Sequence, residues 1–298
     1  MTAGSSPEKS LDRRDPTRPL KSGLHLVATP IGHLGDCSPR SLETLALADL
    51  VLCEDSRVTG KLLKLNGIER SLLPYHEHNA ARMRPRVLDH LARGESVALA
   101  SDAGTPLVSD PGYKLVRDVI EAGHEVLAVP GPSAALAALV VSGLPTDRFL
   151  FGGFLPPRSK ARCRAIEELA SVPTTLIWFE SAKRLAATLA DLAAVLGPRP
   201  AAVARELTKA FEEVRRGSLE ELAETIAGEE ALRGEIVIVV GPPDAEEGAE
   251  SDEAVNERLR QALETMAPSA AAASVAQQTD RSRKELYRRA LALRTGQS

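Results

Sequence analysis

From Leu24 onward the sequence repeats one pattern: a short apolar run, a turn rich in glycine, proline and aspartate, and then a segment with helical spacing. This alternation is typical of α/β folds, in which strand, turn and helix follow one another. In the first half it predicts strands at residues 24–29, 49–53, 96–101 and 125–129, and helices beginning near Ser38, Asn79, Gly112 and Ser133. The Val, Leu and Ala content of the strands favours a sheet covered on both faces.

The amino-acid composition changes after residues 143–145, and this change predicts a second domain. Aromatic residues gather there, at Phe149, Phe151, Phe154, Trp178 and Phe179. Its predicted strands are residues 148–151, 174–179, 201–205, 211–216 and 235–240, with helices at 160–170 and 182–196. The short spacing of the last three strands favours some antiparallel pairing.

The remaining segments complete the predicted domain organisation. We expect a disordered tail over residues 1–23, which lacks the apolar run of an export signal, and an acidic linker over 244–253, which carries six acidic residues in ten positions. The two α/β domains then span 24–145 and 146–243. A helical module follows over 254–298, with helices at 253–266, 269–276 and 282–293.

Charge and cysteine content exclude several classes of protein. Lys and Arg number 37 against 41 Asp and Glu, a formal net charge of −4, so any nucleic-acid binding must rely on local patches. Three scattered cysteines form neither a disulfide framework nor a two-plus-two zinc site. No stretch approaches the roughly 20 apolar residues of a transmembrane helix. We therefore predict a soluble, cytoplasmic protein.

Three loops rich in glycine, proline and serine lie where predicted strands end: residues 28–36, 101–106 and 129–134. In open α/β sheets, ligands bind outside the carboxyl ends of the strands, where glycine lets the backbone approach a ligand. The alternative is that these loops are ordinary turns. No Walker A sequence and no G-x-G-x-x-G at the first helix occur, which argues against a triphosphate or a dinucleotide.

Six ordered segments resemble the tetrapyrrole methylase superfamily, most of all its branch that methylates small-subunit ribosomal RNA. They are residues 26–32 (LVATPIG), 53–57 (CEDSR), 75–79 (YHEHN), 101–106 (SDAGTP), 179–181 (FES) with Arg184, and 204–209 (ARELTK). The resemblance runs from about Leu24 to Pro243. It implies a two-domain fold with S-adenosylmethionine in the cleft between the domains. It also implies 2′-O-methylation of a cytidine in the decoding region of 16S rRNA, within the small ribosomal subunit, by a protein of a family whose members are commonly homodimers.

The same resemblance implies the residues of the site. Cofactor contacts fall on Pro30, Asp102, Gly104, Thr105, Ser133, Ala134, Phe179, Ala204, Arg205, Gly234, Glu235 and Ile236. The candidate bases are Glu180, Glu206 and Lys209, of which the lysine would need a lowered pKa. Alternatives remain open: Asp102 as a turn-forming residue, Phe179 as core, and Arg205, Glu206 and Lys209 as structural ion pairs.

Contacts with RNA are expected from a histidine segment and from basic clusters. The implied residues are His76, His78, Asn79, Arg158, Lys160, Arg162 and Arg164, and further clusters lie at 82–86 and 281–294. Such groups hold phosphates, although solvated helix faces are the alternative. The two histidines lack an identifiable third ligand, so we predict no metal.

The sequence departs from the family pattern at three places, and two other functions compete with the implied one. His33 stands where asparagine is usual, Ala182-Lys183 replaces Pro-His, and residues 279–282 replace a Gly-Leu-Pro-like turn. The competing functions are methylation of a tetrapyrrole or another small molecule, and a noncatalytic RNA-binding assembly factor.

Overall fold

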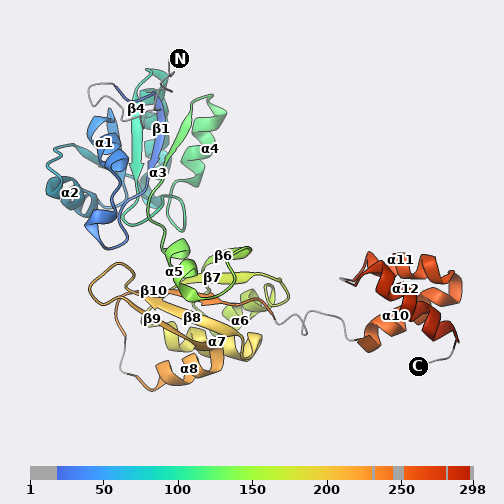
Figure 1. The fold of residues 1–298 in the computed structure, drawn as a ribbon. Coiled ribbons are helices and arrows are strands. Elements are labelled where there is room, and N and C mark those ends of the chain that lie inside the picture. The colour runs from blue at the N-terminus through green and yellow to red at the C-terminus, as the bar shows by residue number, and fades with distance from the viewer. Residues whose placement is uncertain (1–18, 230–231, 244–251, 280, 296–298) are drawn as a thin grey trace, which may run out of the picture.

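The computed structural model describes residues 19–229, 232–243, 252–279 and 281–295. Two α/β domains lie one above the other, and three C-terminal helices form a cluster of their own (Figure 1). The expected α/β architecture with a helical module is therefore confirmed.

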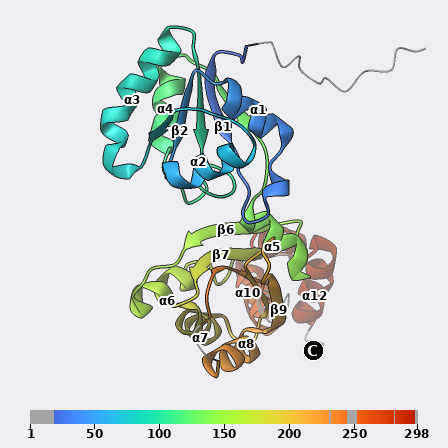
Figure 2. The same ribbon diagram turned by 90° about the vertical axis from the view of Figure 1, so that its left-hand side faces the viewer.

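The first domain is built on a five-stranded parallel sheet in the order β3-β2-β4-β1-β5. Its strands are β1 (Gly23–Val27), β2 (Leu50–Cys53), β3 (Leu72–Pro74), β4 (Ser96–Ala100) and β5 (Val126–Val129). Helices α1 (Pro39–Leu47) and α2 (Ser56–Leu65) pack on one face, and α3 (Glu77–Ala92) and α4 (Tyr113–Glu121) on the other. The carboxyl ends of the strands face the second domain (Figures 1 and 2).

Two elements of this domain have no counterpart among the predicted ones. Strand β3 has only three residues, ends in proline and is partly exposed, so its pattern is too short to stand out. Helix α2 begins after Asp55, whose carboxylate accepts the Arg57 backbone N–H at 2.8 Å. This cap was readable in the sequence, because an aspartate before a helical stretch is a common start signal.

The second domain contains a mixed sheet in the order β6-β7-β10-β8-β9. Its strands are β6 (Phe149–Phe154), β7 (Thr175–Ser181), β8 (Pro200–Arg205), β9 (Glu213–Ser218) and β10 (Glu235–Val240). Strands β6 and β7 are parallel and the other pairs antiparallel. The antiparallel pairing expected among the last three strands is confirmed for β8 with β9 and for β8 with β10. Helices α6 (Ser159–Glu167), α7 (Leu185–Leu196) and α8 (Leu219–Ala227) cover one face.

One prediction for this domain needs correction, and one helix was missed. The predicted strand 211–216 starts at Glu213, and Phe211, 74% exposed, lies in the preceding turn. Helix α8 was not predicted, although Ser218 and Glu221 form a capping box at its start.

Helix α5 (Ala134–Ser142) lies before the predicted domain boundary at residue 145, yet it packs on the second domain. Its buried face, with Ala135, Ala138 and Leu139, packs against β7, β8 and β10 of the second sheet. Figures 1 and 2 both place it against the second domain. Because the helix is apolar on several sides, its own pattern did not reveal which sheet it would cover.

The C-terminal helices are α10 (Asp252–Thr265), α11 (Pro268–Ala276) and α12 (Arg283–Thr295), which share a small core around Leu259, Val275 and Leu286. The predicted linker 244–253 lies outside the described residues, apart from the start of α10. The predicted tail 1–23 lies outside them up to residue 18. Leu20 packs against the first domain and Gly23 starts β1, so the end of that tail belongs to the fold.

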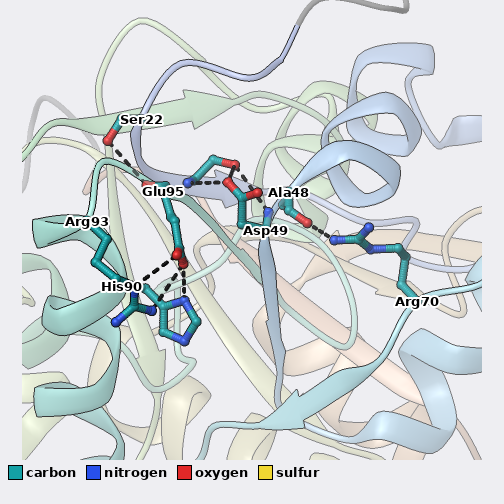
Figure 3. Close-up of polar contacts among 8 residues, drawn as sticks. Ser22, Ala48, Asp49, Arg70, His90, Arg93 and Glu95 are labelled. Carbon is teal, nitrogen blue, oxygen red and sulfur yellow. Dashed lines mark hydrogen bonds and ion pairs between the residues drawn. The ribbon is translucent and has the colours of Figure 1, made fainter.

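Polar contacts link the amino-terminal ends of strands in the first sheet (Figure 3). These strand ends point away from the second domain (Figure 1). The Asp49 carboxylate accepts both the backbone N–H and the hydroxyl of Ser96 at 2.7 Å, which ties β2 to β4. Next to them, Glu95 pairs with His90 and Arg93. These contacts stabilise the sheet at the end that points away from the second domain.

Candidate active site

A cavity of about 360 Å³ lies between the two α/β domains, within the range of small-molecule sites. The first domain lines it with the ends of the three glycine-rich loops and with Val108, Ser109 and Asp110. The second domain contributes Phe154, residues 179–181, Ala204, Leu207 and residues 234–237. Most of this lining is apolar or backbone, with few charged groups.

The three predicted loops meet at one point. Thr29 and Gly104 exchange two backbone hydrogen bonds of 3.0 Å, and the Thr105 hydroxyl donates to the Pro132 carbonyl at 3.0 Å. Gly104 has φ +79°, and a Cβ there would lie 3.3 Å from Ile31. Glycine is needed at this position because its backbone has a left-handed conformation. The absence of a side chain also avoids a close contact with Ile31 at the cavity wall.

On the facing wall, two acidic residues and one lysine form a closed network. The Lys209 ammonium donates to Glu206 and Glu235 at 2.8 Å each, and Glu206 also accepts the Glu235 backbone N–H at 3.0 Å. Gly234, at φ +103°, leaves the room for Glu206, since a Cβ would come within 2.5 Å of its carboxyl group. This network positions the start of β10 along the cavity.

Contacts across the cleft join the two domains. The His33 backbone N–H donates to the Thr208 hydroxyl at 3.0 Å, and a Cβ on Gly32 would lie 2.5 Å from the Lys209 side chain. The His33 ring accepts the Gly35 backbone N–H at 3.0 Å and caps a short 3-10 turn. Histidine here does the hydrogen bonding that an asparagine could do, so this departure from the family pattern leaves the loop intact.

Most residues predicted to touch the cofactor line the cavity. They are Gly104, Thr105, Ser133, Ala134, Phe179, Ala204, Gly234, Glu235 and Ile236. Pro30, Asp102 and Arg205 are not among its lining residues. Asp102 accepts the Asp55 backbone N–H at 2.9 Å, and Arg205 pairs with Glu213 at 3.2 Å, so both brace the loops behind the wall.

The three candidate bases are all engaged by neighbours. Glu180, which lines the cavity and is 3% exposed, accepts the Thr188 hydroxyl at 2.6 Å and pairs with Arg184 at 3.1 Å. The hydrogen bond from Lys209 lowers the pKa of Glu206. Burial would lower the pKa of Lys209, but its hydrogen bonds to Glu206 and Glu235 outweigh burial and raise the pKa. The geometry therefore favours the structural ion-pair interpretation for Glu206 and Lys209.

Asp110 is a cavity residue that the sequence analysis missed. One of its carboxylate oxygens, Oδ2, is buried and has no hydrogen-bond partner. Burial raises its pKa, as does the nearby Asp102 carboxylate. It sits in a loop whose residues Leu107 and Ser109 have positive φ, and the sequence Ser109-Asp110-Pro111-Gly112 was the only available signal of a special turn.

The residues predicted to contact RNA divide into exposed and engaged side chains. Arg158, Lys160 and Arg164 are exposed on or beside α6. Arg162 is 4% exposed and its guanidinium pairs with Asp191 at 2.6 Å, so its charge is already neutralised and we withdraw it from the phosphate contacts.

At the start of α3, His78 is exposed, whereas His76 and Asn79 are partly buried. The Asn79 side chain bonds the backbone of His76 at 3.0 Å and of Pro74 at 2.8 Å, and thus caps the helix. Within the described part of the chain, no group of three His, Cys, Asp or Glu is arranged to hold a metal ion. None of the described helices is both long and apolar enough to cross a membrane.

This chain is similar to known proteins over most of its length. Residues 23–223 match the family of Tetrapyrrole (Corrin/Porphyrin) Methylases, and residues 249–294 match the RsmI C-terminal HTH domain. A protein from Mesorhizobium japonicum, named Ribosomal RNA small subunit methyltransferase I, is 50% identical over 94% of this chain and 95% of its own length. Its namesake from Synechocystis is 42% identical over 91% and 98%.

Solved structures share the fold at lower identity. A cobalt precorrin-4 methyltransferase superposes with a TM-score of 0.55 at 18% identity, covering 73% of this chain and 94% of its own. A diphthine synthase reaches a TM-score of 0.59, also at 18% identity, covering 73% and 89%. At this identity the likeness concerns the fold alone.

Proposed function

Since this chain belongs to the tetrapyrrole methylase family, we propose that it is an S-adenosylmethionine-dependent methyltransferase of small-subunit ribosomal RNA. Its target is the ribose 2′-oxygen of a cytidine in the decoding region of 16S rRNA, within the small ribosomal subunit in the cytoplasm. The observation that carries this proposal is the similarity to rRNA methyltransferases, which extends over both walls of the cavity and the C-terminal helices.

The residues present fit S-adenosylmethionine. This ligand carries a sulfonium and an ammonium group, and the first-domain side of the cavity supplies Asp110, with Asp102 and Glu54 behind it. Phe154 and Phe179, whose ring centroids lie 5.6 Å apart, offer apolar surface for an adenine ring. Gly104, Ser133 and Gly234 bring backbone close to the ligand.

When bound, the cofactor supplies an activated methyl group. The chain itself must align the ribose oxygen with that group and keep water out, because an in-line displacement depends on geometry. The two apolar walls do this on both sides of the cavity. A ribose hydroxyl is a weak nucleophile, so a group that accepts its proton is also required.

Exposed basic residues would hold the RNA. We assign phosphate contacts to Arg158, Lys160 and Arg164 beside the cleft, with His78 at the start of α3.

We also propose a homodimer, because the outer face of α5 exposes Leu136 (49%) and Val140 (71%). Light scattering tests this assignment.

The deciding experiment incubates the purified protein with labelled S-adenosylmethionine and undermethylated small subunits, and maps the modified ribose by nuclease digestion and mass spectrometry. We expect one 2′-O-methylcytidine in the decoding region. Parallel reactions contain free 16S rRNA or a porphyrinoid. Labelling of the porphyrinoid alone would favour the small-molecule alternative, and binding of subunits without any labelling would favour the assembly factor.

A matched pair of variants ties this activity to the cavity. Ala103 is exposed and lines the cavity, so Ala103→Trp fills the site without disturbing the core. Ala194→Trp adds the same ring to an exposed position of α7. We expect only the first variant to lose cofactor binding and methylation, with similar melting temperatures for both.

A further inference from the structure

The cavity needs a group that takes the proton of the ribose hydroxyl, and the described residues of the second domain that line it do not offer a free one. Among the ionisable side chains that line the cavity, Glu180 is held by Arg184 and Thr188, and Glu235 by Lys209. Glu206 and Lys209 neutralise each other behind the wall. A carboxylate in an ion pair holds its proton weakly, because the cation favours the charged form.

Asp110 differs from these residues in its surroundings. It lines the cavity from the first domain, and none of the described residues forms an ion pair with it. Its Oδ2 is buried without a donor. A buried acceptor without a partner is costly, and the cost falls when the carboxyl group takes up a proton.

Burial and the neighbouring Asp102 carboxylate raise the pKa of Asp110, whereas the Ser101 hydroxyl lowers it. Asp110 shares a narrow recess with Glu54, Tyr75 and Ser101, which follow β2, β3 and β4 respectively. Asp102 also follows β4. Burial raises the pKa of Glu54 too, with Asp110 and Asp102 adding to the rise. The Ser101 hydroxyl opposes the rise at Asp110, but its one proton is donated to the Gly104 carbonyl at 3.1 Å.

We propose, on the basis of the function proposed above, that Asp110 is the general base that accepts the proton of the ribose 2′-hydroxyl. Asp110 takes this proton as the ribose oxygen gains the methyl group. One C–O bond forms, the C–S bond of the methyl donor breaks, and its electron pair stays on sulfur, which becomes an uncharged thioether. The neutral carboxylic acid then returns its proton to water after the products leave.

The same position allows a second role, contact with the ammonium group of the cofactor, and the test separates the two. Asp110→Asn keeps the shape and removes the base. The control is Asp89→Asn, which changes an exposed aspartate on α3, outside the cavity. Calorimetry measures S-adenosylmethionine affinity, and single-turnover methylation of small subunits at saturating cofactor measures the chemical step across pH.

We expect Asp110→Asn to lower the single-turnover rate by about 10²–10⁴-fold, the usual contribution of a general base. Cofactor affinity should change less than about threefold, and the rise of the wild-type rate with pH should disappear. Asp89→Asn should match the wild type in all three measurements. An unchanged rate at saturating cofactor would overturn the proposal, and weaker cofactor affinity beside that unchanged rate would assign Asp110 to the ammonium group instead.

A second measurement does not depend on activity. Carbon-13 NMR of the carboxyl groups, with Asp110→Asn used for assignment, follows the titration of Asp110 in the cofactor-bound wild type. A midpoint above the usual aspartate range is expected, and a midpoint within or below it contradicts the proposal. If the wild type methylates no ribose, the proposed function fails, while the titration still reports on Asp110.

Discussion

Individual residues at the cleft divide into those that face the cavity and those that hold its loops in place. Gly104 and Phe179 face the cavity, whereas Asp102 accepts the backbone N–H of Asp55 and joins the loop after β4 to the loop after β2. Family resemblance alone cannot distinguish these two uses of a residue, because both keep the residue type.

Asp102→Ala tests this distinction. It removes the acceptor for the Asp55 N–H, so we expect the free energy of unfolding to fall by about 1–2 kcal/mol and cofactor affinity to fall because the loop is less well ordered. Asp102→Asn keeps an acceptor oxygen and should retain most of both. Chemical denaturation and calorimetry measure the two effects. An unchanged affinity in the alanine variant would show that the contact between Asp102 and Asp55 does not order the cofactor-binding loop.

At the scale of a single element, helix α6 buries one basic side chain and exposes others. Helix α6 and the turn before it carry four basic residues, of which Arg162 points into the domain and Arg158, Lys160 and Arg164 lie outside. The difference follows from helical periodicity, which places Arg162 on the same side as buried Ile166.

Substitutions on α6 should therefore separate stability from RNA binding. Arg162→Ala leaves Asp191 without its partner in a partly buried site, and we expect a loss of about 3–5 kcal/mol in the free energy of unfolding. Arg158→Ala with Arg164→Ala should leave stability within about 0.5 kcal/mol but flatten the salt dependence of subunit binding. A flattened slope in Arg162→Ala, measured where that variant is folded, would contradict the assignment.

The hydrogen bonds from Ser96 to Asp49, which link β2 and β4, predict that the free energy of unfolding depends on pH. Hydrogen bonds from Ser96, first from its backbone and then from its hydroxyl, lower the pKa of Asp49. The folded pKa is below the unfolded one, so this stabilisation is present above the usual aspartate pKa of about 3.9 and is lost as pH falls through the folded value. Asp49→Asn should reduce the acid-induced loss of stability, as followed by urea denaturation between pH 7 and 3. Equal slopes in the two proteins would exclude this role.

At the scale of the whole molecule, the formal net charge of −4 hides a local arrangement. Helix α12 buries Leu286 and Ala290 in the C-terminal core and exposes Arg283, Lys284 and Arg288. This module matches a helix-turn-helix family, so we expect its exposed basic face to add phosphate contacts to those beside the cleft.

Replacing Arg283, Lys284 and Arg288 together by alanine tests this expectation. Each phosphate contact contributes roughly 0.7–0.9 to the slope of log affinity against log salt, so the slope should fall by about 2–3. Cofactor affinity should stay unchanged, because the cavity lies in the two α/β domains. Binding of small subunits across a salt series provides the measurement, and an unchanged slope would leave α12 without a role in RNA binding.

The sequence by itself determined most of the elements and the ligand-binding edge, although the predictions missed β3, α2 and α8. Strand ends and helix starts depend on neighbouring residues: Ser38 and Ser133 cap the helices that follow them, and the loops at residues 28–36, 101–106 and 129–134 meet because parallel strands share one edge. Short or partly exposed elements such as β3 escaped because they carry too few residues to show a period.

The tertiary structure alone decided which side chains are free to react. Arg162 meets Asp191 across 29 residues, Asp102 meets Asp55 across 47, and α5 packs on the sheet that follows it. Burial and charge pairing depend on such distant neighbours, which no local pattern records. For that reason the candidate bases that the sequence suggested are held in ion pairs, while Asp110 faces the cavity without one.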